Sequence, residues 1–141
     1  MSPLSIRPGR PADATSVLEL WRRAGSVPTR TDDEESIRFL IEHDPNALLV
    51  AEDGGDLVGT LIAAFDGWRG MLYRLAVLPE RRRSGVGRAL VAAGERSLRA
   101  RGAVRVSCVA IKAETVALAF WTAAGYVGDH RIRRFVKNLA P

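Results

Sequence analysis

A basic segment with two glycines is the part of the sequence best suited to hold a ligand. Residues 81–88 read Arg-Arg-Arg-Ser-Gly-Val-Gly-Arg and lie between a β-like run and an amphipathic helix. Free backbone N–H groups at the start of a helix attract anions, and glycine lets a phosphate approach the backbone closely. Three arginines, Arg82, Arg83 and Arg88, add positive charge at the same place. The pattern predicts a pyrophosphate site.

Two common phosphate-binding loops do not fit this segment. A Walker loop needs Gly-Lys-Ser/Thr, and neither Lys112 nor Lys137 lies near it. The dinucleotide fingerprint needs a third glycine where Leu90 stands. When the segment is taken alone, a turn that only starts a helix beside solvated arginines stays as the alternative.

Composition restricts the class of protein. The chain has 141 residues, of which 47% are hydrophobic, and a net charge of +5, so one domain over residues 1–141 is expected. The single cysteine, Cys108, excludes an internal disulfide and favours a reducing compartment. No apolar run is long enough for a membrane span, the N-terminus has no signal-peptide pattern, and no metal site is predicted. A cytoplasmic location and no membrane partner are expected.

The order of elements predicts the fold class. Hairpin turns at Asp53-Gly54-Gly55-Asp56 and at residues 66–70 join three β-like runs into an antiparallel meander. A strand, helix and strand follow, which implies a parallel pair with a right-handed crossover. The predicted class is α/β (α+β) with a mixed sheet. Strands are expected at residues 4–7, 47–52, 57–65, 71–78, 104–110 and 132–136. Helices are expected at residues 11–24, 85–101 and 114–124. A further helix is expected to begin at the capping box of Thr31 and Glu34 and to stop before Pro45.

A second segment lies one strand downstream of the glycines. It reads Ala117-x-x-Phe120-Trp121-x-x-x-Gly125-Tyr126, and the first segment contains Arg82-Arg83-Ser84-Gly85-Val86-Gly87. Together with the element order, these two segments closely resemble the GCN5-related N-acetyltransferase (GNAT) superfamily. The run "FDGWRG" before "LYRLAVLPE" resembles a small bacterial subgroup of that superfamily.

The resemblance implies a single GNAT-like domain whose central parallel strands splay apart, flanked by helices, with acetyl-CoA as acetyl donor. Pantetheine would lie between the strand that ends at Val77 and the strand that starts at Val104, pairing with Leu75 and Val77. A backbone N–H near Val77 would polarise the thioester carbonyl, and a neutral amine would attack directly. The cofactor-binding residues implied are Leu75, Ala76, Val77, Arg82, Arg83, Ser84, Gly85, Val86, Gly87, Arg88, Glu114 and Trp121.

Three departures from the family pattern concern proton transfer. The family's usual Asn is Glu114, and its usual proton-donating Tyr is Trp121, whose indole is too weak an acid. Met71 and Val109 stand where some branches carry a catalytic glutamate. Proton transfer through water is one expectation, with positioning supplying most of the rate.

Among the remaining side chains, Tyr73 is the candidate catalytic residue. Strand alternation predicts that Tyr73 shares a face with Met71 and Leu75, and a half-buried tyrosine that only stabilises the sheet is the alternative. The acidic run from Asp32 to Glu35 would either attract a cationic amine or start a helix. Buried packing is favoured for Cys108 and solvation for His43 and His130.

These residues support three functions. The favoured one is an N-acetyltransferase acting on the primary amine of a small molecule, a protein N-terminus or a lysine. A non-catalytic acetyl-CoA-binding regulatory module is the alternative. A nucleic-acid-binding domain is disfavoured, since no aromatic residue lies within the arginine cluster at 81–83. Dimers are common in the family, so a homodimer is one expected state.

Overall fold

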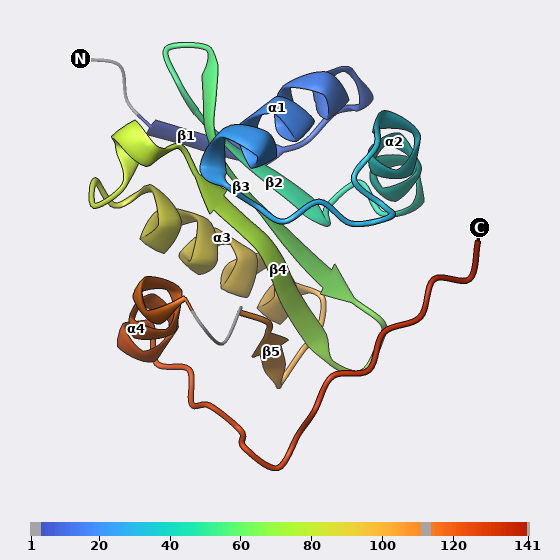
Figure 1. The fold of residues 1–141 in the computed structure, drawn as a ribbon, viewed down its shortest axis with the longest axis vertical. Helices are drawn as coiled ribbons and strands as arrows, with labels where there is room; N and C mark the ends of the chain where they lie inside the picture. Colours follow the sequence, from blue (N-terminus) through green and yellow to red (C-terminus); the bar gives the residue numbers. More distant parts are fainter. Residues whose placement is uncertain (1–3, 111–113, 141) are drawn as a thin grey trace. The chain divides into compact units, whose positions relative to one another are not determined.

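The computed structural model describes residues 4–110 and 114–140, in two compact units that are divided after Val109. The N-terminal unit contains a five-stranded sheet in the order β1-β2-β3-β4-β5 (Figure 1). The first four strands are antiparallel, and β4 and β5 are parallel. The strands are β1 (Leu4–Pro8), β2 (Leu48–Asp53), β3 (Asp56–Phe65), β4 (Gly70–Val77) and β5 (Val106–Cys108).

Helices cover both faces of this sheet. On one face lies α1 (Ala14–Ala24), with α2 (Glu34–His43) beside it, and on the other lies α3 (Val86–Ala100). The indole of Trp21 on α1 donates to Thr60 on β3 at 2.8 Å, which identifies the α1 face. On the α3 face, a Cβ added at Gly94 would stand 2.8 Å from Leu61, so glycine there allows α3 to approach β3 closely.

The C-terminal unit contains one helix, α4 (Thr115–Ala123). Its indole at Trp121 packs edge-on against Phe120 and Tyr126, with ring centroids 5.4 and 5.1 Å apart. No described helix is long and apolar enough to cross a membrane. Whether residues 1–141 form one domain stays a prediction.

The fold class, the meander and the four helices are confirmed, and two local predictions are wrong. Residues 132–136 form no strand, so β5 ends the described sheet and the parallel pair lies at its edge rather than at its centre. That run lacks the strict alternation of a half-buried strand. The residue that caps α2 is Asp33, which accepts from the Ser36 N–H at 2.7 Å, and not Thr31.

Candidate functional site

The loop before α3 has the backbone geometry of an anion site. Arg83 and Gly85 both adopt positive φ, of 64° and 88°. The first intrahelical bond of α3 runs from the Ala89 N–H to the Gly85 carbonyl, at 3.0 Å. Among the described residues, no backbone carbonyl accepts from the N–H groups of residues 83–88. Successive N–H groups left free by such turns form a concavity that binds anions.

The arginines around this loop differ in what they contact. Arg81 pairs with Asp53 at 2.5 Å, and Arg82 donates to the carbonyl of Ala24 at 2.9 Å, at the end of α1. The side chains of Arg83 and Arg88 are exposed and have no ion-pair or hydrogen-bond partner within the described parts of the chain. Arg83 and Arg88 are therefore the cations most available to a phosphate.

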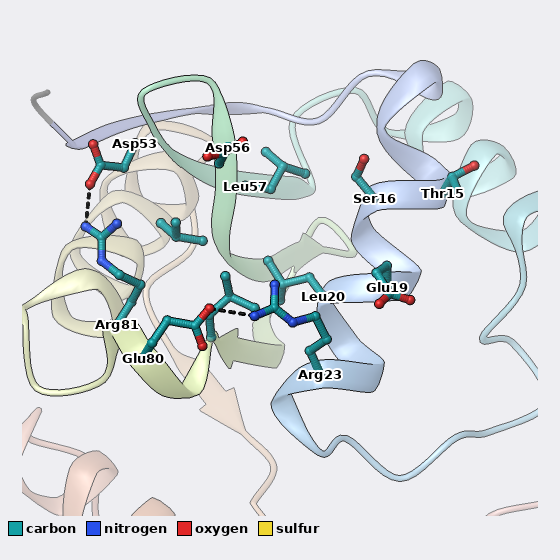
Figure 2. A pocket seen from close by; sticks show the side chains of 12 residues that line it. Thr15, Ser16, Glu19, Leu20, Arg23, Asp53, Asp56, Leu57, Glu80 and Arg81 are labelled. Carbon is teal, nitrogen blue, oxygen red and sulfur yellow. Dashed lines mark hydrogen bonds and ion pairs between the residues drawn. The ribbon is translucent and has the colours of Figure 1, made fainter.

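A hollow beside the loop is occupied by structural ion pairs (Figure 2). It has a volume of about 650 Å³ and lies between α1, the β2–β3 hairpin and the turn at Pro79–Arg81. Arg23 pairs with Glu80 at 2.6 Å, as Arg81 does with Asp53, so two residues of the turn are held by ion pairs. None of the predicted cofactor-binding residues lines this hollow. Its ion pairs hold the turn that precedes the loop at residues 82–88.

The open edge of β4 is the second feature that could hold a donor. The pairing of β4 with β5 covers only Gly70–Leu72 against Val106–Cys108. Beyond it, residues 73–77 have a described neighbouring strand on one side only, which is β3. Since the Leu78 N–H donates to Val58 on β3 at 3.0 Å, the preceding N–H of Val77 points to the unpaired side. The edge from residue 73 to residue 77 therefore offers backbone groups to an extended ligand.

Tyr73 lies on the α1 face of β4, and its predicted relation to Leu75 is wrong. Tyr73 pairs with Ile62 and Ala76 pairs with Thr60, so two residues of β4 lie opposite Leu61 alone. This bulge breaks the alternation, and Leu75 lies on the α3 face while Tyr73 keeps the face of Met71. Tyr73 is 36% exposed, and partial burial raises the pKa of its phenol, so the phenol keeps its proton at neutral pH.

Most of the acidic run at the start of α2 is used in local contacts. Asp32 pairs with Arg74 at 2.7 Å, Asp33 caps the helix, and Glu34 lies 3.6 Å from Arg38. Hydrogen bonds from Ser36 lower the pKa of the Asp33 carboxyl, as expected for a cap. The helix-start interpretation is favoured over the recruitment of an amine.

The remaining predicted residues lie in other settings. Glu114 is the N-cap residue of α4, but its side chain makes no capping hydrogen bond. Burial raises the pKa of the Cys108 thiol, which disfavours the nucleophilic thiolate. No three metal-ligating side chains come together in residues 4–110 and 114–140. Sequence reasoning missed Arg74, since nothing in its own neighbourhood distinguishes it from other strand arginines.

Comparison with known proteins identifies the family. Residues 14–126 match the acetyltransferase (GNAT) family. An acetyltransferase of Photorhabdus laumondii is 40% identical over 103 residues, covering 73% of this chain and 72% of the relative. An acetyltransferase of Sodalis glossinidius is 36% identical over 104 residues, covering 74% and 73%.

Solved structures agree on the fold. The aminoglycoside acetyltransferase AAC(6')-Iy, solved with a CoA-linked acetylneamine analogue, has a TM-score of 0.78 and 19% identity, covering 97% of this chain and 99% of that one. Diaminobutyrate acetyltransferase from Paenibacillus lautus, solved with its substrate and coenzyme A, has a TM-score of 0.73 and 21% identity, covering 88% and 75%. Since the family match includes both the loop at 82–88 and the segment at 117–126, the chain belongs to the acetyltransferase (GNAT) family, whose acetyl donor is acetyl-CoA.

Proposed function

We propose that the protein transfers an acetyl group from acetyl-CoA directly to a primary amine. The observation that carries this proposal is a pair of backbone features in the N-terminal unit. The free N–H groups of residues 83–88 follow the open edge of β4 after one short turn, at Pro79–Arg81. One feature suits a pyrophosphate and the other suits an extended chain with amides.

The residues present fit acetyl-CoA, which supplies an acetyl group activated as a thioester. The N–H groups of residues 83–88 would hold the pyrophosphate, with Arg83 and Arg88 neutralising its charge. The unpaired edge at Leu75 and Val77 would hold the pantetheine amides. The Val77 N–H is also suited to stabilise negative charge on the carbonyl oxygen, which is the role of an oxyanion-hole donor.

Direct transfer needs a neutral amine and no nucleophile from the protein. Attack by the amine nitrogen on the carbonyl carbon would form the amide and break the carbon–sulfur bond. The nitrogen would lose one proton to water, and the sulfur would leave as a thiolate that takes up one proton. The raised pKa of Cys108 argues against an acyl-enzyme on the only thiol of the chain. Tyr73 stays protonated and would donate this proton either directly or through water.

The acceptor is a primary amine of a small molecule, a protein N-terminus or a lysine. Two structurally similar proteins support the small-molecule class, since their substrates or analogues are an acetylneamine and 2,4-diaminobutyric acid. A cytoplasmic location and a homodimer, both expected from the sequence, complete the proposal. Glu114 and Trp121 are included as residues near the donor on the strength of the family pattern alone.

Thiol release from acetyl-CoA tests this function. We expect release that depends on an added amine, across a panel of an aminoglycoside, 2,4-diaminobutyrate, spermidine and a lysine-containing peptide, with the acetylated product identified by mass spectrometry. The Gly87→Glu variant is the negative control, because its new carboxylate would block the proposed donor site. If acetyl-CoA binds in calorimetry but no amine of a broad panel is acetylated, the regulatory-module alternative is correct.

A further inference from the structure

The side chain of Arg74 is a cation on the α1 face of β4. Its guanidinium lies 4.9 Å above the centre of the Trp21 ring on α1 and pairs with Asp32, which precedes α2, at 2.7 Å. Tyr73, the proposed proton donor, lies on the same face of the strand. Two neighbouring residues of β4 therefore present a phenol and a guanidinium to one face of the sheet.

One of the three guanidinium nitrogens makes all the hydrogen bonds of this side chain. Nη2 donates to Asp32 at 2.7 Å, to the Val27 carbonyl at 3.3 Å and to the Thr29 hydroxyl at 3.4 Å. Nε and Nη1 of Arg74 donate to no acceptor among the described residues. Since no buried polar side-chain atom in residues 4–110 and 114–140 lacks a hydrogen-bond partner, both nitrogens reach solvent. Arg74 therefore keeps donors for a ligand, although its side chain is only 19% exposed.

Three of the four carboxylates at the start of α2 are engaged in local contacts. Asp32 is paired with Arg74, and Asp33 caps the helix. The Glu34 carboxylate lies 3.6 Å from Arg38. A guanidinium with free donors beside carboxylates that are already engaged favours an acceptor with a negative charge over one with a second positive charge.

The α1 face of the open edge is the side left for the acceptor. In the proposed function the pyrophosphate of the donor lies at residues 83–88, at the start of α3, which covers the opposite face of the sheet. An acceptor on the α1 face meets Tyr73 and Arg74 and reaches the thioester beside Val77. Three residues of a strand span about 10 Å, so an acceptor that contacts residues 74 and 77 together has its two ends several bonds apart.

From this geometry we infer that the acceptor is a free amino acid that is acetylated on its side-chain amine, and that Arg74 binds its carboxylate. Nε and Nη1 supply charge-assisted hydrogen bonds to the carboxylate, and the side-chain amine reaches the acetyl carbon. The carbon–sulfur bond breaks as the carbon–nitrogen bond forms, the nitrogen loses one proton to water, and the thiolate takes up one proton. Arg74 transfers no proton. This inference rests on the proposed function and selects the small-molecule class of acceptor.

Two pairs of acceptors test the inference, because the members of each pair differ only by the carboxylate. Lysine is compared with cadaverine, and ornithine with putrescine, at saturating acetyl-CoA. We expect wild type to have a kcat/KM for each amino acid about tenfold or more above that for its diamine, mainly through KM, as one charge-assisted hydrogen bond supplies. Fragmentation in the mass spectrometer should place the acetyl group on the side-chain nitrogen. Calorimetry on the complex with coenzyme A measures the same preference without chemistry.

Variants of the ion pair separate recognition of the carboxylate from a structural role. Arg74→Gln removes the charge and Arg74→Lys keeps it, and both place a side chain other than glycine at the positive φ of residue 74. We expect the preference for amino acids to fall by about tenfold in Arg74→Gln and to stay within about threefold in Arg74→Lys. Asp32→Asn removes the competing carboxylate, so the preference should stay or rise by a few-fold. Arg99→Gln, the same loss of charge at an exposed residue of α3, is the matched control and should match wild type.

Several results would overturn the inference and leave the proposed function standing. Equal kcat/KM values for amino acid and diamine in wild type would show that no carboxylate is recognised. Equal losses for both members of a pair, in Arg74→Gln and in Asp32→Asn alike, would show that the ion pair is only structural. Acetylation of a lysine-containing peptide, spermidine or an aminoglycoside without acetylation of lysine or ornithine would assign the acceptor to another class. If acetyl-CoA binds and no amine is acetylated, the proposed function fails and this inference fails with it.

Discussion

The two sequence segments that predict the family both place a positive-φ glycine at a helix end, and the structure uses them in opposite ways. Gly85 comes directly before α3, and the N–H groups that follow it bond to no described backbone carbonyl. Gly125 follows Ala124, the C-cap residue of α4, and the N–H groups here donate to carbonyls of the last helical turn. Its N–H donates to Thr122 at 3.0 Å, and the next N–H, of Tyr126, donates to Trp121 at 3.0 Å.

This difference separates a binding loop from a packing turn. Free N–H groups beside exposed arginines have bonding capacity left for a ligand. In the second segment the turn folds Tyr126 back onto Trp121, and the result is aromatic packing. We therefore expect substitutions in the first segment to act on donor binding, and substitutions in the second to act on packing and on kcat.

The largest effect is expected for Gly87→Glu in the first segment. The new carboxylate would stand among the N–H groups that we propose hold the pyrophosphate, and we expect acetyl-CoA affinity to fall by about 100-fold or more, through repulsion and lost access. An acidic residue in the first turn of α3 favours the helix, so the thermal midpoint should not fall. Calorimetry measures the affinity, with Gly128→Glu as the control at an exposed glycine outside both segments. Unchanged affinity in Gly87→Glu would remove the donor site from this loop.

Tyr73→Phe tests whether the open edge of β4 also carries a proton donor. We expect kcat to fall by about tenfold or more at an unchanged KM, within the range typical for loss of a general acid. Burial raises the pKa of Tyr73 above its usual value near 10, so the phenol keeps its proton as the pH rises through the neutral range. The wild-type rate should then lose this contribution only above pH 10. Equal kcat values for the two proteins would leave proton transfer to water.

Sequence predicts the parts of this site that depend on neighbours in the chain. The glycines of the loop, the amphipathic face of α3 and the helix end at Gly125 each follow from residues within one turn of one another, so periodicity and glycine placement find them. Four of the six expected strands are recovered with ends that differ by one residue, while β5 is shorter at both ends.

The remaining features depend on residues that are distant in the chain. Arg82 contacts the Ala24 carbonyl across 58 positions, and Arg74 contacts Asp32 across 42. The bulge at Arg74 is set by the register against Leu61 and by Thr60, which no local pattern encodes. Consequently, the sequence does not reveal the contact of Arg82 with Ala24, and it assigns Leu75 to the wrong face.

A comparison of acetyl-CoA affinity in Arg88→Ala and Arg82→Ala tests which arginine of the first segment contributes more to donor binding. The Arg88 side chain has no partner in the described residues, whereas Arg82 is committed to the end of α1. We expect Arg88→Ala to weaken acetyl-CoA binding by about tenfold, as loss of one charged hydrogen bond does, and Arg82→Ala to weaken it less. Calorimetry at two salt concentrations measures both. The reverse order would show that Arg82 leaves Ala24 when the donor binds.

Trp121→Tyr tests the second segment. A tyrosine restores the family's usual acid, and we expect kcat on a good amine to rise by a few-fold. This increase is smaller than the usual gain from general-acid catalysis, because a thiolate can leave without a strong acid. The smaller ring gives up part of the packing against Phe120 and Tyr126, so the thermal midpoint should fall slightly. Trp121→Phe is the matched control, since it has the ring size of tyrosine without the hydroxyl. If both variants change kcat alike, packing rather than an acid explains the change.

The smallest effect is expected at Glu114, which lies just before the second segment, at the N-cap of α4. Its side chain makes no capping bond to α4, so Glu114→Asn should leave the thermal midpoint nearly unchanged, and asparagine is itself a favourable capping residue. Since the family pattern proposes Glu114 as a donor-site residue, removal of its negative charge should keep acetyl-CoA affinity or tighten it by about twofold, the size expected for one screened charge. Glu114→Gln separates the loss of charge from the shape of asparagine, and the two variants should agree if charge alone matters. A clear loss of affinity in both, with the fold intact, would mean that the Glu114 carboxylate itself has been recruited to a specific role.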